Sequence, residues 1–341
     1  MRILTFTEND KNRIGILIGD IVYDLEEVCR SIKEVKVIKV APFFPVDIDV
    51  SKLTVIDVIE MGDAGKKALH AIELYVRWAE TNGDFMLLRK ARRKCEDITW
   101  QPPITDPRLL FGIGGNSPLF FRDKEYQIPA YPRGFIRPLS RHTLIGHNGH
   151  VTIPPHYDTM RASAEMGVVI GKSGKDIAAA EAMDHVWGYT LVNDMCSDAW
   201  KVVALGDVEE SEMLTDLTIF TQRASTSYYS RSTDQFAAIG PYIVSKCQVP
   251  DPYNLMVHNK LTGRTRERGY TQAMVNSIER TVSFLSRIFT LQPGMILHMG
   301  TMGIDGYTIE RDMPLSQDDY FEIEYEQIGS LRCYVDDKRK G

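Results

Sequence analysis

Two apolar segments, each with a carboxylate at its edge, constrain the fold of this chain more than any other feature. Residues 164–172 read AEMGVVIGK, and residues 188–194 read GYTLVND. A run of Val and Ile that ends at a glycine is typical of a strand buried on both faces. A carboxylate at the entrance of such a strand is costly unless it is paired or holds a metal. We therefore expect both Glu165 and Asp194 to have a partner.

The overall composition is that of a soluble globular protein. Of 341 residues, 43% are hydrophobic and 25% are charged, and a chain of this length can bury one large core and a smaller unit. The net charge of -6 argues against a nucleic-acid partner. The N-terminus becomes polar too soon for a secretory signal and no apolar run approaches a membrane span, so we predict a cytoplasmic protein without membrane contact. Five widely spaced cysteines without a Cys-x-x-Cys pair favour reduced thiols.

Residue patterns divide the chain into two units. Residues 1–24 alternate apolar and polar side chains around two glycines, which predicts antiparallel strands and a hairpin turn. Within 64–95 apolar residues recur at helical spacing and predict one or two amphipathic helices. Three prolines within 101–107 interrupt any regular element. We therefore place a boundary there, between a small N-terminal domain (1–105) and a larger domain (106–341).

The larger unit should be rich in β-structure. Many short apolar runs are separated by Gly, Pro, Asn and Asp, and the alternation at 320–325 predicts a strand near the C-terminus. One longer helix is expected at about 271–289, where apolar residues recur on one face. The sequence thus predicts a β-rich α+β fold.

The order of these motifs closely resembles the fumarylacetoacetate hydrolase family. In that family the two strands read Glu-x-Glu-Leu-Ala-Val-Val-Ile-Gly and Gly-Tyr-Thr-x-x-Asn-Asp, which match 163–171 and 188–194 here. Further landmarks follow in the family's order at 109–116 (LLFGIGGN), 135–140 (FIRPLS), 232–244 (STDQFAAIGPYIV), 290–294 (TLQPG) and 299–301 (MGT). The resemblance implies a mixed β-roll catalytic domain after a small N-terminal α+β domain, usually a homodimer, with a short oxo acid as its small-molecule substrate.

The resemblance also implies a divalent metal held by three carboxylates. Glu165 and Asp194 stand at two of these positions, but Ser163 replaces the third. Residues two apart on a strand point to the same side, so Ser163 and Glu165 should both face the site, with Asp194 on the neighbouring strand. Oxygen ligands of this kind suit Mg²⁺, Mn²⁺ or Ca²⁺, held weakly here or not at all after the loss of one carboxylate. The alternative interpretation is that both carboxylates only cap strand ends or form ion pairs.

The remaining positions of the family's site are altered. Hydrolytic members use a His-x-x-Glu dyad to activate water, whereas this chain has Phe120 and Asp123 at the matching positions, and phenylalanine accepts no proton. Where the family carries an arginine after the Asn-Asp motif, this chain has Asp198, which suggests a less anionic substrate or an acid–base role. Arg231 and Thr301 keep a cation and a hydroxyl where substrate is expected. The candidate catalytic residues are thus Asp123, Asp198, Arg231 and Thr301.

Two other motifs carry less information. His142, His147 and His150 lie downstream of the altered dyad and could supply a base, although a polar loop with exposed imidazoles is the simpler interpretation. Gly112-Ile113-Gly114-Gly115 hints at a dinucleotide loop, but Pro118 follows closely. We therefore assign no nicotinamide cofactor.

Together these features predict an enzyme that acts on an enolisable oxo or dioxo compound. A divalent cation chelated by two substrate oxygens can stabilise the enolate left beside a carbonyl. The outcome would be carbon–carbon bond hydrolysis or lyase chemistry, decarboxylation, isomerisation or cyclisation; the missing histidine favours a non-hydrolytic one. The alternative is a metal-free, catalytically degenerate protein that keeps the fold for binding or as a scaffold.

Overall fold

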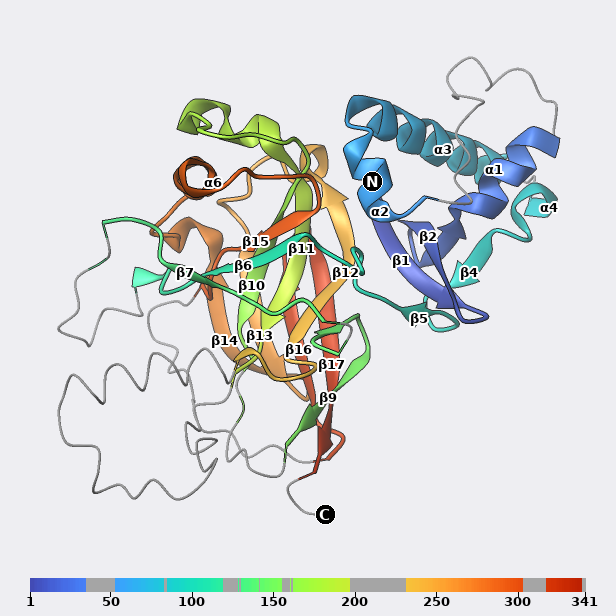
Figure 1. The fold of residues 1–341 in the computed structure, drawn as a ribbon. Coiled ribbons are helices and arrows are strands. Elements are labelled where there is room, and N and C mark those ends of the chain that lie inside the picture. Colours follow the sequence, from blue (N-terminus) through green and yellow to red (C-terminus); the bar gives the residue numbers. More distant parts are fainter. Residues whose placement is uncertain are drawn as a thin grey trace, which may run out of the picture.

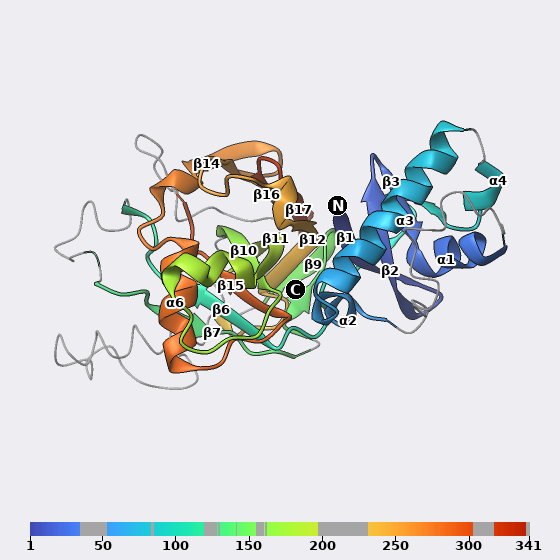
Figure 2. The same cartoon turned by 90° about the horizontal axis from the view of Figure 1, so that it is seen from above.

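A computed structural model describes residues 1–34, 53–82, 85–118, 128, 130–140, 142–154, 160, 162–196, 231–302 and 317–338. These residues form one sheet of 12 strands and one of 5, with helices at both ends of the molecule (Figure 1). Figure 2 shows α1 (Leu25–Glu34) and α3 (Asp63–Thr81) at one end and α6 (Ile278–Ile288) at the other. The β-rich α+β class predicted from the sequence is confirmed.

The larger sheet has the strand order β4-β3-β2-β1-β12-β11-β10-β15-β6-β7, with β5 beside β1 and β8 beside β12. Its strands are β1 (Arg2–Glu8), β2 (Lys11–Ile18), β3 (Ile21–Asp24), β4 (Arg92–Lys94), β5 (Thr99–Trp100), β6 (Leu109–Ile113), β7 (Gly134–Ile136), β8 (Leu144–Ile145), β10 (Ala164–Ile170), β11 (Val186–Asp194), β12 (Ala237–Ser245) and β15 (Met295–His298).

The smaller sheet has the order β14-β13-β16-β17-β9. Its strands are β9 (Gly149–Ile153), β13 (Met256–Leu261), β14 (Arg264–Tyr270), β16 (Tyr320–Tyr325) and β17 (Gly329–Asp337). Strand β16 confirms the strand predicted at 320–325, because buried and half-buried side chains alternate along it.

The N-terminal strands confirm the predicted hairpin and also extend the large sheet. β1 pairs antiparallel with β2, and β2 with β3. On its other edge β1 pairs with β12, in the register Arg2 to Val244 and Ile3 to Ile243. The first residues of the chain are therefore held to the larger unit by backbone hydrogen bonds.

The helical prediction for 64–95 is right at its start and wrong at its end. α3 ends at Thr81 and is followed by the short α4 (Phe85–Leu88), whereas residues 92–94 form strand β4. β4 pairs antiparallel with β3, and the Arg93 guanidinium forms a 2.6 Å ion pair with Glu8. Sheet pairing here overrides the local preference of a charged segment.

Strands β10 and β11 are buried along their whole length, as predicted. They pair antiparallel and lie in the middle of the large sheet (Figure 1). Val168 packs in the core shared with the smaller sheet, and Val169 packs in the second core on the opposite face. Alternation places Glu165 on the same face as Val169, so a charged side chain ends an otherwise apolar row.

The helix expected at 271–289 begins later than predicted. Residues Thr271–Ala273 form a 3₁₀ turn, and α6 begins only after Ser277, whose hydroxyl accepts a hydrogen bond from the Arg280 N–H at 3.1 Å. An N-terminal serine cap of this kind fixes a helix start. The other helical segments in the described residues are α2 (Val55–Glu60) and the 3₁₀ segments Ala179–His185 and Lys246–Gln248.

Within the described part of the chain, no helix combines the length and apolar character that crossing a membrane requires.

Candidate functional site

Three adjacent strands bring together three buried ionisable side chains. Glu165 lies at the start of β10, Asp194 at the end of β11, and His298 at the end of β15, on the other side of β10. Their potential ligand atoms all lie within 4.8 Å of one another. The sheet therefore places two carboxylates and one imidazole in a single cluster.

Glu165 and His298 form a hydrogen-bonded pair. His298 Nδ1 lies 2.5 Å from Glu165 Oε2, which also accepts a hydrogen bond from the Gly300 N–H at 2.9 Å. Burial raises the pKa of Glu165, while the charge of His298 and both hydrogen bonds oppose that rise. When Glu165 is ionised, Nδ1 must carry the proton, which leaves Nε2 of the neutral ring as an acceptor.

The His298 ring is fixed by its neighbours, but its second nitrogen is not satisfied. Nε2 is buried and has no hydrogen-bond partner in the described structure. The ring packs on Gly112 of β6, where any Cβ would overlap it, and meets the Phe135 ring edge-on at 5.7 Å between centroids. An oriented imidazole with one free acceptor nitrogen is suited to proton transfer or ligand binding.

Two arginines hold the other carboxylate. Arg137 Nε donates to Asp194 Oδ1 at 2.6 Å, and Arg231 Nε donates to Oδ2 at 3.2 Å. Arg137, which follows β7, is fully buried and also donates to the Met195 carbonyl at 2.8 Å and to the Arg231 carbonyl. Burial alone would raise the pKa of Asp194, but the two guanidinium groups outweigh it and hold that pKa below its usual value.

The site residues predicted from the sequence are brought together only in part. Glu165 and Asp194 meet in the cluster, and Arg231 contacts Asp194. Ser163 lies opposite Asp194, because its carbonyl accepts the Asp194 N–H at 3.1 Å. Thr301 directly follows Gly300, which contacts Glu165. Asp123, Asp198 and Phe120 lie outside the described residues.

Two residues of the site, His298 of the cluster and Arg137 that binds Asp194, were not identified from the sequence. His298 ends the apolar run Met-Ile-Leu, and its pairing opposite Gly167 becomes apparent only from the antiparallel register of β10 and β15. Arg137 lies in the family landmark at 135–140, which by itself assigns it no role in the site. A cationic side chain in an otherwise apolar segment is the signal that could have indicated a buried partner for a carboxylate.

The loop histidines make other contacts. His147 Nδ1 accepts the Arg332 N–H at 3.2 Å, and its ring packs edge-on against Trp100. Burial lowers the pKa of His147 to about 4, and the charge of Arg332 adds to this shift. His150 lies 3.2 Å from Asp336 and stacks on Tyr334, while His142 is exposed. His147 and His150 thus both have structural partners in β17.

The cluster does not fit a divalent cation while the arginines stand where they are. Both Asp194 oxygens already accept hydrogen bonds from guanidinium groups, so a cation bound to either oxygen would lie against an arginine. The charges of Glu165 and Asp194 are also balanced by those of Arg137 and Arg231. A hard divalent cation prefers carboxylate oxygens that carry excess negative charge.

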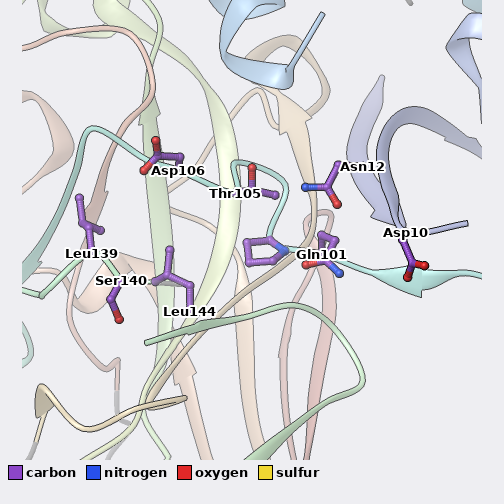
Figure 3. Close-up of a pocket in the computed structure, with 9 residues that line it drawn as sticks. Asp10, Asn12, Gln101, Thr105, Asp106, Leu139, Ser140 and Leu144 are labelled. Carbon is purple, nitrogen blue, oxygen red and sulfur yellow. The ribbon is translucent and has the colours of Figure 1, made fainter. Parts of the chain in front are cut away.

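A cavity of about 560 Å³ lies away from these contacts, between the β1–β2 hairpin and the polar segments that precede β6 and β8 (Figure 3). It is lined by Asp10, Asn12, Gln101, Pro102, Thr105, Asp106, Leu139, Ser140 and Leu144. None of the cluster residues lines it, so we assign it no catalytic role.

Comparison with known proteins agrees with this architecture. An uncharacterised protein of Staphylococcus aureus is 26% identical over 98% of this chain and 99% of its own length. The crystal structure of maleylpyruvate hydrolase from Sphingobium sp. SYK-6, in complex with manganese(II) and pyruvate, matches with a TM-score of 0.65 at 19% identity, over 99% of each chain. The structure of 5-carboxymethyl-2-hydroxymuconate delta-isomerase from Mycobacterium smegmatis matches with a TM-score of 0.63 at 20% identity, again over 99% of each chain.

The family model that describes the C-terminal part of fumarylacetoacetate hydrolase matches residues 114–336, which include every described residue of the cluster. This match covers more than half of the chain and confirms the resemblance read from the motifs. The chain belongs to the fumarylacetoacetate hydrolase family.

Proposed function

We propose that this chain is an enzyme that removes a proton from the carbon beside the oxo group of a small oxo or dioxo acid, with His298 as the base. The observation that carries the proposal is the pairing of His298 Nδ1 with Glu165 Oε2 at 2.5 Å, which leaves the buried Nε2 without a partner among the described residues. Nε2 lies against Gly112, so a substrate that displaces this contact would satisfy the atom. Solved structures of similar fold are enzymes, among them a hydrolase and an isomerase.

The chemistry can be followed through the residues of the chain. A proton passes from the substrate carbon to His298 Nε2, and the electron pair of the C–H bond moves to the oxo oxygen as an enolate. Glu165 stabilises the imidazolium that forms, because its carboxylate already accepts the Nδ1 proton. Arg231 keeps its proton, since burial alone would lower its pKa but the neighbouring Cys196 and Asp194 raise it by more, and it supplies positive charge near the enolate.

The expected outcome is non-hydrolytic. Phe120 stands where hydrolytic relatives carry the water-activating histidine, so proton return to another carbon, which is isomerisation, needs fewer groups than hydrolysis. If the substrate instead loses carbon dioxide at this centre and leaves an enolate, the reaction is a decarboxylation. Asp198 and Asp123 remain candidates for a second acid–base group, and Thr301 for a substrate contact. The homodimer and the cytoplasmic location stay predictions.

A second candidate is the metal-assisted version of this chemistry, with Mg²⁺, Mn²⁺ or Ca²⁺ held by Glu165, Asp194 and either His298 or Ser163. It is favoured by the 4.8 Å grouping of the first three residues and by the manganese in the similar maleylpyruvate hydrolase structure. It would require Arg231 to leave Asp194. The metal would then serve as the electron sink for the enolate.

The test is exchange of the substrate's carbon-bound proton with solvent. Pyruvate and acylpyruvates are incubated with the protein in D₂O, and deuterium at the carbon beside the oxo group is followed by NMR. His298→Asn keeps a donor for Glu165 but removes Nε2, so we expect its exchange rate to fall by roughly 10²–10⁴-fold.

His150→Asn is the matched control, because His150 is exposed and pairs with Asp336. It should exchange at the wild-type rate. Equal exchange rates for His298→Asn and wild type would contradict the assignment of His298 as the base. No exchange or product with any oxo acid in the wild type would favour the binding or scaffold alternative.

A further inference from the structure

We infer that the positive charge of this catalytic centre comes from the guanidinium groups of Arg137 and Arg231, and that the centre works without a divalent cation. The inference deepens the proposed function and rests on it, because only that proposal makes the centre catalytic. Its test measures metal binding instead of turnover, so the inference and the proposed function can fail independently of each other.

Geometry supports the inference through the atoms that surround Asp194. Each of its oxygens is occupied by a different arginine, at 2.6 Å for Arg137 Nε and 3.2 Å for Arg231 Nε. The Asp194 side chain is only 3% exposed, so no turn of the carboxylate toward water would free an oxygen for a metal. In a buried setting, the arginines replace the attraction that a cation would otherwise provide.

Charge balance supports it independently. Among the described side chains that touch one another here, the ionised Glu165 and Asp194 contribute two negative charges and the two arginines contribute two positive ones, while Ser163 adds none. A divalent cation in this cluster would leave a buried net charge of about +2, which is costly where water is excluded. With a third carboxylate at position 163 and no arginine at 231, the same cluster would instead carry excess negative charge.

The two arginines have different parts in this arrangement. Arg137 is fully buried and also binds two backbone carbonyls, so it is a fixed positioning residue that cannot leave without unpairing them. Arg231 is 23% exposed and lies over the Phe135 ring at 5.1 Å. Arg231 is therefore the arginine that can be substituted with the smaller risk of unfolding the protein.

The experiment asks whether removing the Arg231 charge creates a metal site. Wild type, Arg231→Met, Arg231→Lys and the double variant Ser163→Glu/Arg231→Met are purified with a chelator and dialysed. Mn²⁺ is then titrated by calorimetry and by electron paramagnetic resonance, and melting temperature is recorded with and without Mn²⁺. Arg231→Lys is the matched control because it keeps the charge, and Arg231→Gln replaces the Met variant if that variant does not fold.

We expect no Mn²⁺ binding by the wild type or by Arg231→Lys, and measurable binding by Arg231→Met. The double variant should bind at least tenfold more tightly than Arg231→Met, which corresponds to about 1.4 kcal/mol and should appear as a higher melting temperature in Mn²⁺. One Mn²⁺ bound per wild-type chain would overturn the inference. Failure of both Arg231→Met and the double variant to gain Mn²⁺ would also overturn it, because the arginine would then not be what excludes the cation.

Discussion

At the scale of single residues, two glycines allow the Glu165–His298 pair to form. Gly300 donates its N–H to Glu165 from a backbone with φ of +79°, and a Cβ there would lie 2.7 Å from the Ile113 carbonyl oxygen. Gly112 leaves the space in which the His298 ring packs. A larger residue at 112 would overlap the His298 ring, and at 300 it would be strained by the positive φ and would meet the Ile113 carbonyl.

A further buried carboxylate, Glu267 on β14, gives the protein a pH-dependent stability. Its Oε1 has no hydrogen-bond partner in the described structure. Burial raises the pKa of Glu267 to about 7; the nearby charge of Glu165 adds to the rise, and a hydrogen bond with Asn259 opposes it. Because the folded protein holds this proton more tightly than the unfolded chain, the stabilisation is complete below the unfolded pKa of 4.5 and is lost as pH rises toward 7.

Glu267→Gln should remove this dependence. Relative to wild type, the variant should gain on the order of 3 kcal/mol in free energy of unfolding between pH 4.5 and pH 8, since each pKa unit is worth about 1.4 kcal/mol. Urea unfolding of both proteins across that range measures the difference. A wild-type-minus-variant difference that does not change with pH would contradict the raised pKa.

At the same scale, the sequence indicates the carboxylates but not all of their partners. Glu165 and Asp194 stand out because a charge beside a Val-Val-Ile run has few explanations. Arg137 and His298 do not stand out in the sequence. Arg137 lies 57 residues from Asp194, and His298 lies 133 residues from Glu165. Such contacts depend on strand order, and local pattern does not encode it.

At the scale of secondary-structure elements, Asn116 joins three segments around the site. Its Nδ2 donates to the carbonyls of Asn276 at 3.1 Å and Met299 at 2.8 Å, and its Oδ1 accepts the Asn276 N–H at 2.7 Å. Met299 lies between His298 and Gly300, so this side chain holds the exit of β15 against the turn after β6 and the segment before α6. Asn116, the last residue of the landmark at 109–116, thus has a positioning role.

Asn116→Ala should destabilise the protein by roughly 2–4 kcal/mol, because it leaves buried backbone groups without partners. Asn82→Ala is the control, since that exposed side chain donates one hydrogen bond to the Trp78 carbonyl at the end of α3. Its effect should stay below about 1 kcal/mol. Thermal or urea unfolding measures both, and similar losses for the two variants would refute the special role of Asn116.

Elements set by local pattern were predicted better than elements set by pairing. β10, β11 and β16 follow from runs and alternations of apolar residues. β4 consists of charged residues and becomes a strand only because β3 lies beside it. The start of α6 was placed too early because apolar spacing continued through 271–277, whereas the cap at Ser277 decides the boundary.

At the scale of the whole molecule, the N-terminal strands and the strands that carry Glu165, Asp194 and His298 share one sheet. β1 joins β12, which pairs with β11, so a row of backbone hydrogen bonds links the first strand to the strand that carries Asp194. The division at residues 105 and 106 stays a prediction. The prolines near 101–107 mark a change in chain direction, but they gave no indication of this pairing.

The central claim is that the protein alone supplies the positive charge of this centre. The most direct measurement is the rate at which wild-type protein exchanges substrate protons in D₂O, before chelation, after chelation with EDTA, and after addition of Mn²⁺. We predict the same exchange rate in all three samples. The chelated sample should contain less than about a tenth of an equivalent of bound divalent metal per chain. An exchange rate that disappears on chelation and returns with Mn²⁺ would contradict the account.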